Sequence, residues 1–358
     1  MKEFTQRIAD YSKSYPGMEL LDENNFTQQM FSIAHPFMNQ FKKDEFITLP
    51  ADEDAKKSPE KLTEVRIHAE TYFLPKDESR ATIFMLHGFT GFTGKFYEVI
   101  YYFLKQHYSV VAIDFRGHGH SSRELDDGHD AKTYIQKFES YISDTLAIYE
   151  KLVKPNSNGK PIFLYAHSMG GAVATHLVEL HPEYFAGVIL SCPMFGVNSG
   201  SIPQPVVKAL CKLMILKNGG TDYIAGAHDF DYKGEFTMKC GKSVSFNRYA
   251  YYNELRKVDT RYFSKYATYR WLSQAMRGGK NACKPKNAQK ANLPILLIQC
   301  EFENVVTAKE HKLFAQNAPN IDVLLMKDCE HELFSSHNEY LGAYYYEIFS
   351  FYDKILQN

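Results

Sequence analysis

The chain alternates between short strand-like runs and longer helix-like stretches, and this alternation limits the folds open to it. The run "TIFMLHG" at 82–88 is continuously apolar, as expected for a strand buried on both faces. Helix-like patterns such as 131–153 stand between several of the strand-like runs. The other strand-like runs lie at 64–74, 109–115, 161–168, 186–193, 294–300 and 322–328. Strands that alternate with helices predict an α/β protein with a doubly wound, mostly parallel sheet.

This alternation is interrupted once. It stops at Pro193 and resumes near Leu293, after an interval rich in aromatic residues, lysine and glycine. An insertion at the carboxyl end of a strand lies above the sheet edge where open α/β sheets bind ligands. We therefore expect a mainly helical cap, inserted after the sixth strand. The predicted parts are an N-terminal extension over 1–41, a core over 42–193 and 291–358, and the cap over 194–290.

The segment "PIFLYAHSMGGAV", residues 161–173, runs from a predicted strand through a serine into two glycines. A nucleophilic serine on a sharp strand-to-helix turn needs small residues two positions before and after it, so that strand and helix can approach. Ala166 and Gly170 meet this condition around Ser168, although alanine replaces the first glycine of the usual G-x-S-x-G pattern. The other interpretation of such a serine is an ordinary helix cap. The strand before it and the helix after it favour a nucleophile.

A serine nucleophile on such a turn requires an acid and then a histidine further along the chain. His331, in "MKDCEHELF", lies between the last predicted strand and the final helical stretch. The acid should follow "PILLIQC", where Glu301 stands at the strand end and Glu303 at the turn into the next helix. We favour Glu303 over Glu301. The donors to an oxyanion should be the backbone N–H groups of Met169, just after the serine, and Phe89, after the early apolar strand.

The segment "IDFRGHGHSS", residues 113–122, also gathers chemically active side chains. It precedes the serine and so falls outside the required chain order. We therefore interpret Asp114 and Arg116 as structural. His118 and His120 have no dependable third ligand nearby, so we expect no metal there.

Charge is unevenly distributed along the chain. The formal net charge is −1, yet residues 195–290 contain 17 Lys and Arg against 6 Asp and Glu. Within this interval, residues 205–220 have the pattern of one basic amphipathic helix. One interpretation is a lid helix resting on the core, and another is a lid that also touches an anionic membrane. No nucleic-acid motif accompanies these charges, so nucleic acid is a poor candidate partner.

The sequence favours a cytoplasmic protein, with peripheral contact at the inner membrane face as a further option. No apolar run approaches the roughly 20 residues of a membrane-spanning helix, and the first residues lack the apolar run of a secretory signal. The cysteines show neither a CxxC pair nor zinc-type spacing. We expect all six to be free thiols: Cys192, Cys211, Cys240, Cys283, Cys300 and Cys329.

Seven short strings occur in a fixed order: "LHGFTG", "DFRGHGHSS", "AHSMGG", "CPMFG", "RYAYY", "TYRWL" and "CEHELF". Together they resemble the lysophospholipase L2 and monoglyceride lipase branch of the α/β-hydrolases, over roughly residues 46–352. The two cap strings, with Ala166 and Glu303, are more similar to the lysophospholipase L2 type. The resemblance implies an α/β-hydrolase fold and a serine esterase that acts on lipids with one acyl chain, without a metal or organic cofactor. The resemblance also implies that Ser168, Glu303 and His331 are the catalytic triad.

The expected reaction is hydrolysis of the fatty-acyl ester of a single-chain lipid, above all a lysophospholipid. Burying a dozen methylenes at about 0.8 kcal/mol each outweighs the roughly 1 kcal/mol of an exposed Lys or Arg paired with phosphate, so the chain should dominate affinity. The alternatives are a monoacylglycerol lipase, a general carboxylesterase, or a lipid-binding protein of the same fold without turnover. The complete set of Ser168, Glu303 and His331 argues against the last.

Overall fold

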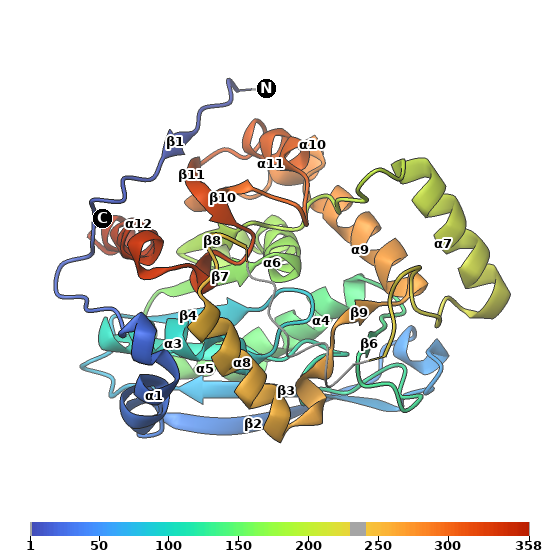
Figure 1. Cartoon of the computed structure of the whole chain (residues 1–358), viewed down its shortest axis with the longest axis horizontal. Helices are drawn as coiled ribbons and strands as arrows, with labels where there is room; N and C mark the ends of the chain where they lie inside the picture. The colour runs from blue at the N-terminus through green and yellow to red at the C-terminus, as the bar shows by residue number, and fades with distance from the viewer. Residues whose placement is uncertain (1, 230–240, 358) are drawn as a thin grey trace.

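The computed structural model describes residues 2–229 and 241–357 (Figure 1). Among these residues, nine strands form one sheet, in the spatial order β1-β11-β10-β8-β7-β4-β5-β3-β2. β2 and β3 pair antiparallel, as do β3 and β5, and the other neighbouring strands of this sheet pair in parallel. The strands are β1 (Arg7–Ile8), β2 (Lys42–Pro50), β3 (Glu64–Tyr72), β4 (Ala81–Leu86), β5 (Tyr108–Ile113), β7 (Ile162–His167), β8 (Gly187–Ser191), β10 (Ile295–Phe302) and β11 (Ile321–Glu330).

Helices cover both faces of this sheet, as Figure 1 shows. The longer ones are α3 (Tyr97–Lys105), α4 (Glu139–Ile148), α6 (Met169–Leu180), α7 (Gln204–Asn218), α8 (Phe246–Val258), α9 (Tyr269–Ala282), α11 (Ala308–Ala315) and α12 (Asn338–Leu356). The shorter ones are α1 (Phe26–Gln29), α2 (His35–Met38), α5 (Lys154–Asn156) and α10 (Pro285–Ala288). The mostly parallel, doubly wound α/β architecture predicted from the sequence is thereby confirmed.

The central strands are buried on both faces because they separate two hydrophobic cores. Successive side chains of a strand point to opposite faces. In β7, Leu164 and Ala166 pack with α4 and α6, whereas Phe163 and Tyr165 pack with α3 and α12. This double burial explains why the sequence shows continuous apolar runs here instead of an alternating pattern.

One predicted element differs in its bounds. The helix expected over 131–153 begins only at Glu139, where α4 starts, and its last turn continues through Val153. The residues before it include β6 (Lys132–Thr133), which pairs in parallel with β9 (Tyr266–Ala267). This pairing joins the core to the segment between β8 and β10, and a long-range partner of this kind is invisible to local periodicity.

Between β8 and β10 the described residues form α7, α8, α9 and α10. The helix predicted over 205–220 is present as α7, which begins after Pro203 and ends at the left-handed Gly219. α7 stands at the edge of the molecule in Figure 1 and packs against α9. The predicted thiol of Cys240 lies outside the described residues, and the other five cysteines are free thiols.

The N-terminal segment runs along one side of the molecule in Figure 1. β1 extends the sheet beside β11, and Phe26 of α1 meets Tyr251 of α8 edge to face at a ring distance of 5.7 Å. The segment therefore packs on both the sheet edge and the helix α8. Within the described part of the chain, no helix combines the length and the apolar character needed to cross a bilayer.

Candidate active site

Ser168 lies on a strained turn between β7 and α6. Its backbone has φ +50° and ψ −116°, a conformation that residues other than glycine rarely adopt. The turn is possible because α6 starts very close to β4: a Cβ added at Gly170 would lie 2.4 Å from the carbonyl oxygen of Leu86. This geometry places the serine at the carboxyl end of the sheet.

His331 follows β11 and reaches the serine. Its Nε2 lies 2.9 Å from Oγ of Ser168, and its Nδ1 lies 2.7 Å from Oε2 of Glu303. A carboxylate can only accept, so Nδ1–H donates to Glu303 and Nε2 is left to accept the hydrogen of the serine hydroxyl. The three side chains therefore form one hydrogen-bonded row, from three different loops at one sheet edge.

The carboxylate of Glu303 is held by its own loop. Its Oε1 accepts the backbone N–H of Val305 at 2.9 Å and of Val306 at 3.1 Å. Burial alone would raise the pKa of Glu303, but the hydrogen bond and charge of His331 and these two N–H groups lower it to about 2. Glu301, the alternative acid, is exposed and instead accepts the N–H of Asp328 at 2.9 Å.

The pKa of His331 is raised above the usual histidine range. Burial opposes this change, but the contacts with Cys192 and with Glu303 favour the protonated ring. In its neutral form such a ring is a stronger base than an ordinary histidine towards the hydroxyl of Ser168. An anionic neighbour at Nδ1 would then stabilise the imidazolium that forms.

Two backbone amides beside Ser168 could hold an oxyanion. Met169 is the first residue of α6, where the N–H groups have no acceptor within the helix. The loop that carries Phe89 is close to the serine, because a Cβ added at Gly88 would lie 3.1 Å from Cβ of Ser168. In the part of the chain that the structure describes, neither the amide of Phe89 nor that of Met169 donates to a protein acceptor. Both predicted donors are thus available to a ligand.

A cavity of about 410 Å³ opens beside His331 and has walls from both the core and the segment after β8. Lys95 and Glu332 line it from the core and form an ion pair at 2.5 Å. Asn253 and Arg256 of α8 line it from the other side. The sequence reasoning missed these residues, because nothing local shows that α8 lies over the loop after β4.

Arg256 is the most unusual charge in this cavity. Within the described residues its guanidinium has no carboxylate in ion-pair range; it donates to the carbonyl of Tyr262 and to Oδ1 of Asn253, both at 3.3 Å, and lies 5.7 Å from the ring centroid of Phe92. Burial lowers its pKa. The same residue acts on Lys95, whose pKa is lowered by burial and, further, by the charge of Arg256. Two cations thus share a partly desolvated cavity next to the histidine.

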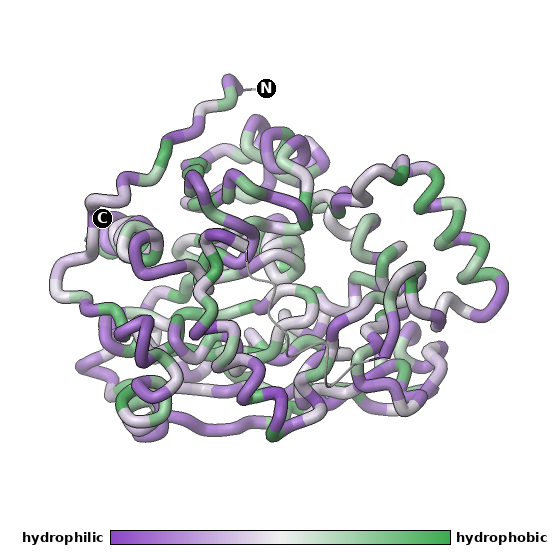
Figure 2. Tube along the Cα trace, in the orientation of Figure 1, coloured by the Kyte–Doolittle hydropathy of each residue, from purple (hydrophilic) through white to green (hydrophobic). Residues whose placement is uncertain are grey.

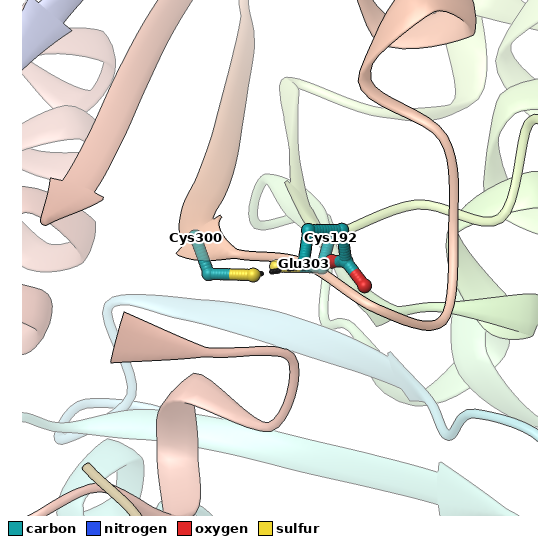
Figure 3. Close-up of side chains that lie close together, drawn as sticks. All are labelled: Cys192, Cys300 and Glu303. Carbon is teal, nitrogen blue, oxygen red and sulfur yellow. Dashed lines mark hydrogen bonds between the residues drawn. The ribbon is translucent and has the colours of Figure 1, made fainter. Parts of the chain in front are cut away.

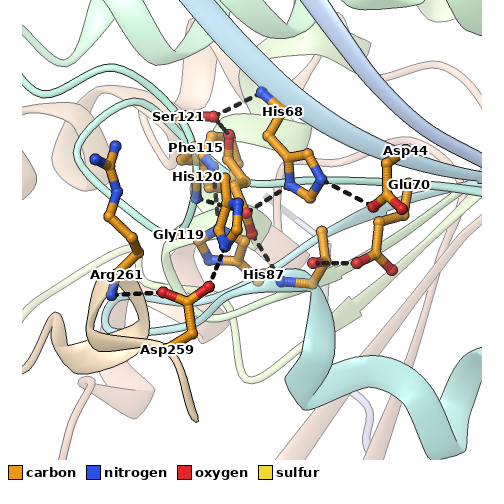
Figure 4. A network of polar contacts seen from close by, with 12 residues as sticks. Asp44, His68, Glu70, His87, Phe115, Gly119, His120, Ser121, Asp259 and Arg261 are labelled. Carbon is orange, nitrogen blue, oxygen red and sulfur yellow. Dashed lines mark hydrogen bonds and ion pairs between the residues drawn. The ribbon is translucent and has the colours of Figure 1, made fainter. Parts of the chain in front are cut away.

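Asp114, which the sequence reasoning assigned to structure, is hydrogen-bonded to His68 and His120, both labelled in the network of Figure 4. It accepts the N–H of Thr93 at 2.8 Å, Nδ1–H of His68 at 2.8 Å and the N–H of His120 at 3.0 Å. Burial opposes ionisation, but these bonds lower its pKa to about 2. A Cβ at Gly119 would lie 2.1 Å from its Oδ2, so the loop closes tightly on the carboxylate. Its oxygens are fully engaged in holding the loop.

Arg116 is also enclosed by protein partners. Its guanidinium contacts Glu124 at 2.6 Å, Asp144 at 2.7 Å and Asp52 at 3.1 Å. Neither it nor Asp114 contacts the serine row.

Two groups of side chains among the described residues place potential metal ligands within 4.8 Å of one another. One contains Cys192, Cys300 and Glu303, drawn in Figure 3. The other contains Asp44, His68 and Glu70, which belong to the network of Figure 4. His118 and His120, the histidines considered from the sequence, belong to neither group.

Comparison with known proteins gives a consistent result. The family described as serine aminopeptidase, S33, matches residues 77–338. A probable lysophospholipase L2 of Haemophilus influenzae is 26% identical over 273 residues, 74% of this chain and 81% of that protein. The lysophospholipase L2 of Escherichia coli is 25% identical over 62% of this chain, and the match spans 63% of its own length. Human monoglyceride lipase is 31% identical over 130 residues, 36% of this chain and 40% of that protein.

The fold has counterparts among solved structures. A soluble variant of monoglyceride lipase from Saccharomyces cerevisiae, in complex with a substrate analog, superposes with a TM-score of 0.64 at 17% identity. The superposition covers 87% of this chain and 95% of that one. The monoacylglycerol lipase of Paleococcus ferrophilus gives a TM-score of 0.59 at 19% identity, over 81% and 98% of the two chains. At these identities the likeness concerns the fold.

Proposed function

The chain belongs to the serine aminopeptidase S33 family of α/β-hydrolases, in the branch of lysophospholipase L2 and monoglyceride lipase, and we propose that it cleaves the fatty-acyl ester of lysophospholipids. It is a carboxylic ester hydrolase, and its relatives act on lipids. The substrate head group and the catalytic residues are the proposed part. The observation that carries them is the row from Ser168 through His331 to Glu303, at 2.9 and 2.7 Å, beside a cavity lined by the cations Lys95 and Arg256.

In the proposed mechanism, Ser168 Oγ attacks the ester carbonyl while Nε2 of His331 takes its proton. The new negative charge on the carbonyl oxygen is held by the N–H groups of Met169 and Phe89. His331 then gives the proton to the leaving glycerol oxygen, and an acyl-enzyme remains on Ser168. A water molecule, deprotonated by His331, attacks this ester; the acyl–Oγ bond breaks, His331 returns the proton to Oγ of Ser168, and the fatty acid is released. Glu303 orients the ring and stabilises its charged form throughout.

A fluorophosphonate probe tests the nucleophile directly. We expect one equivalent of probe on Ser168 in the wild type, loss of ester hydrolysis in the labelled protein, and no labelling of Ser168→Ala. The variant should lose at least about 10³-fold in turnover, since the remaining oxyanion contacts supply only part of the rate enhancement. Full activity in Ser168→Ala would disprove the mechanism.

The cavity supports a phosphate-bearing substrate. Arg256 has no carboxylate partner there, so a phosphate beside it would gain a charge-assisted hydrogen bond without displacing an existing ion pair. Such bonds to charged groups contribute about 1.5 to 3 kcal/mol, more than an exposed pair would. Head-group preference should therefore depend on Arg256, although chain burial dominates total affinity.

Matched substrates separate this proposal from a monoacylglycerol lipase. We expect kcat/KM for a lysophospholipid to exceed that for the monoacylglycerol with the same acyl chain. In Arg256→Gln the preference should shrink about tenfold or more, because only the phosphate loses a partner. The glutamine keeps a hydrogen-bonding head and similar length. An equal loss for both substrates would show that Arg256 supports the cap and does not read the head group.

We also propose that α7 brings the cytoplasmic enzyme to an anionic membrane. In α7, Val206 is 54% exposed, Leu213 61% and Leu216 75%. Cys211 is the only described residue of this helix that is buried. Figure 2 shows this helix as a mixture of apolar and polar positions at the molecular edge. Lys208, Lys212 and Lys217 of the same helix suit anionic head groups. The free thiols agree with a reducing compartment.

Sedimentation with vesicles tests this contact. Binding to vesicles with anionic lipid should weaken as salt rises from about 0.05 to 0.5 M, because salt screens exposed charges. A Leu213→Asp, Leu216→Asp double variant should bind less while retaining activity on a water-soluble short-chain ester. Salt-independent or absent binding of the wild type would contradict the proposal.

A further inference from the structure

The carboxylate of Glu303 has one donor that the family mechanism does not require. Its Oε1 is filled by two backbone N–H groups, and its Oε2 accepts Nδ1–H of His331. The remaining position on Oε2 is occupied by the thiol of Cys300, whose Sγ lies 3.1 Å away. The oxygen that holds the histidine is therefore shared with a cysteine, as Figure 3 shows for the thiol and the acid.

Cys300 is placed for this contact by an irregularity in the sheet. It is the last buried residue of β10, and the register between β10 and β11 shifts between Cys300 and Phe302. Such a bulge bends a strand and redirects its side chains. Here the chain leaves the sheet and turns, so that Glu303, three residues later, returns over Cys300.

The thiol is a neutral donor in this position. The contact with Cys192, burial and the adjacent Glu303 all raise the pKa of Cys300, so the sulfur keeps its hydrogen at neutral pH. The Sγ atoms of both cysteines lie within 4.8 Å of the Glu303 carboxylate oxygen. A protonated thiol next to a carboxylate donates to it and adds no charge of its own.

A glutamate needs such a contact more than an aspartate would. Its side chain has one further rotatable bond, and fixing a glutamate side chain costs up to about 2 kcal/mol in rotamer freedom. The two N–H groups hold only Oε1, so the carboxylate could still pivot about that oxygen. A second fixed donor on Oε2 removes this motion and keeps the oxygen in line with His331.

From these contacts we propose that Cys300 is a positioning residue for the triad acid: its S–H holds Oε2 of Glu303 in line with Nδ1 of His331. The inference rests on the proposed triad and adds a fourth side chain to it. Cys300 touches neither the substrate nor Ser168 in this proposal and acts only through Glu303.

Three substitutions separate hydrogen-bond donation from packing. Cys300→Ser keeps a donor of similar size, Cys300→Ala removes the donor and volume, and Cys300→Val fills the space without a donor. We expect Cys300→Ser to stay within about threefold of the wild-type kcat. The alanine and valine variants should each lose about tenfold, which corresponds to about 1.4 kcal/mol, the net value of one hydrogen bond.

The loss should appear in kcat, with KM within about twofold, because the charge on His331 develops only in the transition state. A packing role would instead leave Cys300→Val as active as the serine variant or more so. Rates are divided by the fraction of molecules that a fluorophosphonate labels, and thermal unfolding follows the fold. Cys283→Ala is the matched control: it removes a buried core thiol that donates to the carbonyl of Lys280, at 3.5 Å, and should keep wild-type kcat.

The outcomes distinguish this inference from the proposed function. If wild-type protein neither reacts with the probe at Ser168 nor hydrolyses esters, the triad itself is wrong. If the wild type is active and the alanine and valine variants keep full kcat, Cys300 does not position Glu303. A serine variant as slow as the alanine variant, or a valine variant as fast as the serine one, would overturn the proposal equally. Should the alanine variant fail to fold, the valine and serine pair still decides.

Discussion

Two of the histidine–carboxylate pairs among the described residues, His331 with Glu303 and His68 with Asp114, differ in what the second ring nitrogen meets. In one pair, Nδ1 of His331 lies 2.7 Å from Glu303, and Nε2 faces the hydroxyl of Ser168. In the other, Nδ1 of His68 lies 2.8 Å from Asp114, and Nε2 lies 3.3 Å from Asp44. The first ring has a carboxylate on one side and a nucleophile on the other. The second has carboxylates on both sides.

This difference shows that a histidine–carboxylate contact does not define a catalytic site. The pKa of Asp114 and that of Glu303 are both lowered to about 2, so the acids resemble each other electrostatically. What differs is access. His331 borders a cavity of about 410 Å³, whereas both carboxylate oxygens of Asp114 accept hydrogen bonds from the protein itself. The first pair has the surroundings that the proposed proton transfer needs, and the second holds a loop.

Removing the charge of Glu303 should mainly lower kcat, whereas removing that of Asp114 should mainly lower stability. The loss of kcat at Glu303 is the largest effect that we expect. In Glu303→Gln the amide cannot stabilise the imidazolium, and it favours the wrong ring tautomer. We expect kcat to fall about 10³ to 10⁴-fold, as for other triads that lose their acid charge. Thermal unfolding should change little. Ester hydrolysis and circular dichroism measure the two effects, and a kcat within tenfold of wild type would remove Glu303 from the triad.

The structural acid should show the reverse pattern. Asp114→Ala leaves His68 and two buried N–H groups without their partner, and breaking a buried pair typically costs about 3 to 5 kcal/mol of unfolding free energy. Molecules that remain folded should keep kcat within a few fold. Urea unfolding gives the first quantity and active-site titration the second. A large loss of kcat per labelled molecule would place Asp114 in the catalytic machinery after all.

On acidification, activity, which depends on His331, and stability, which depends on Asp114, should be lost at different pH values. His331 must be neutral to accept a proton, and its raised pKa means that kcat/KM falls on acidification above the usual histidine value of about 6.5. The pKa of Asp114 is lowered in the folded state, so the stability that its ionised carboxylate contributes is present above about pH 4 and is lost as pH falls towards 2. That contribution is about 2 kcal/mol. Activity should therefore disappear in a protein that is still folded, and coincident loss of activity and structure would contradict this order.

The smallest effect is expected at the acid that the sequence left as an alternative. Glu301→Gln removes an exposed carboxylate that accepts the N–H of Asp328, and the glutamine oxygen can accept the same bond. We expect kcat and KM within twofold of wild type. A loss near that of Glu303→Gln would mean that Glu301 moves to His331 during turnover.

Much of the fold and of the candidate site could be predicted from the sequence. The buried strands appear in the sequence as continuous apolar runs because both of their faces are covered. The chain order of serine, acid and histidine limits the candidates for the triad. The structure brings Ser168, His331 and Glu303 together, while their catalytic role stays a prediction. The start of α4 was misplaced because β6 pairs with β9, 134 residues later by register (Lys132 with Tyr266).

The sequence by itself determined the alternating architecture, the turn that carries Ser168 and the loops that could supply its partners, since each depends on neighbours in the chain. Only the tertiary structure decided that Arg256 and Lys95 share a cavity and that Cys300 lies against Glu303. It also decided that the carboxylate of Asp114 is hydrogen-bonded to His68 and not left to bind a ligand. These contacts depend on where separate strands and helices end in space. Local spacing carries no record of that, because hydrogen bonds and charges act through a few ångströms of space and not along the chain.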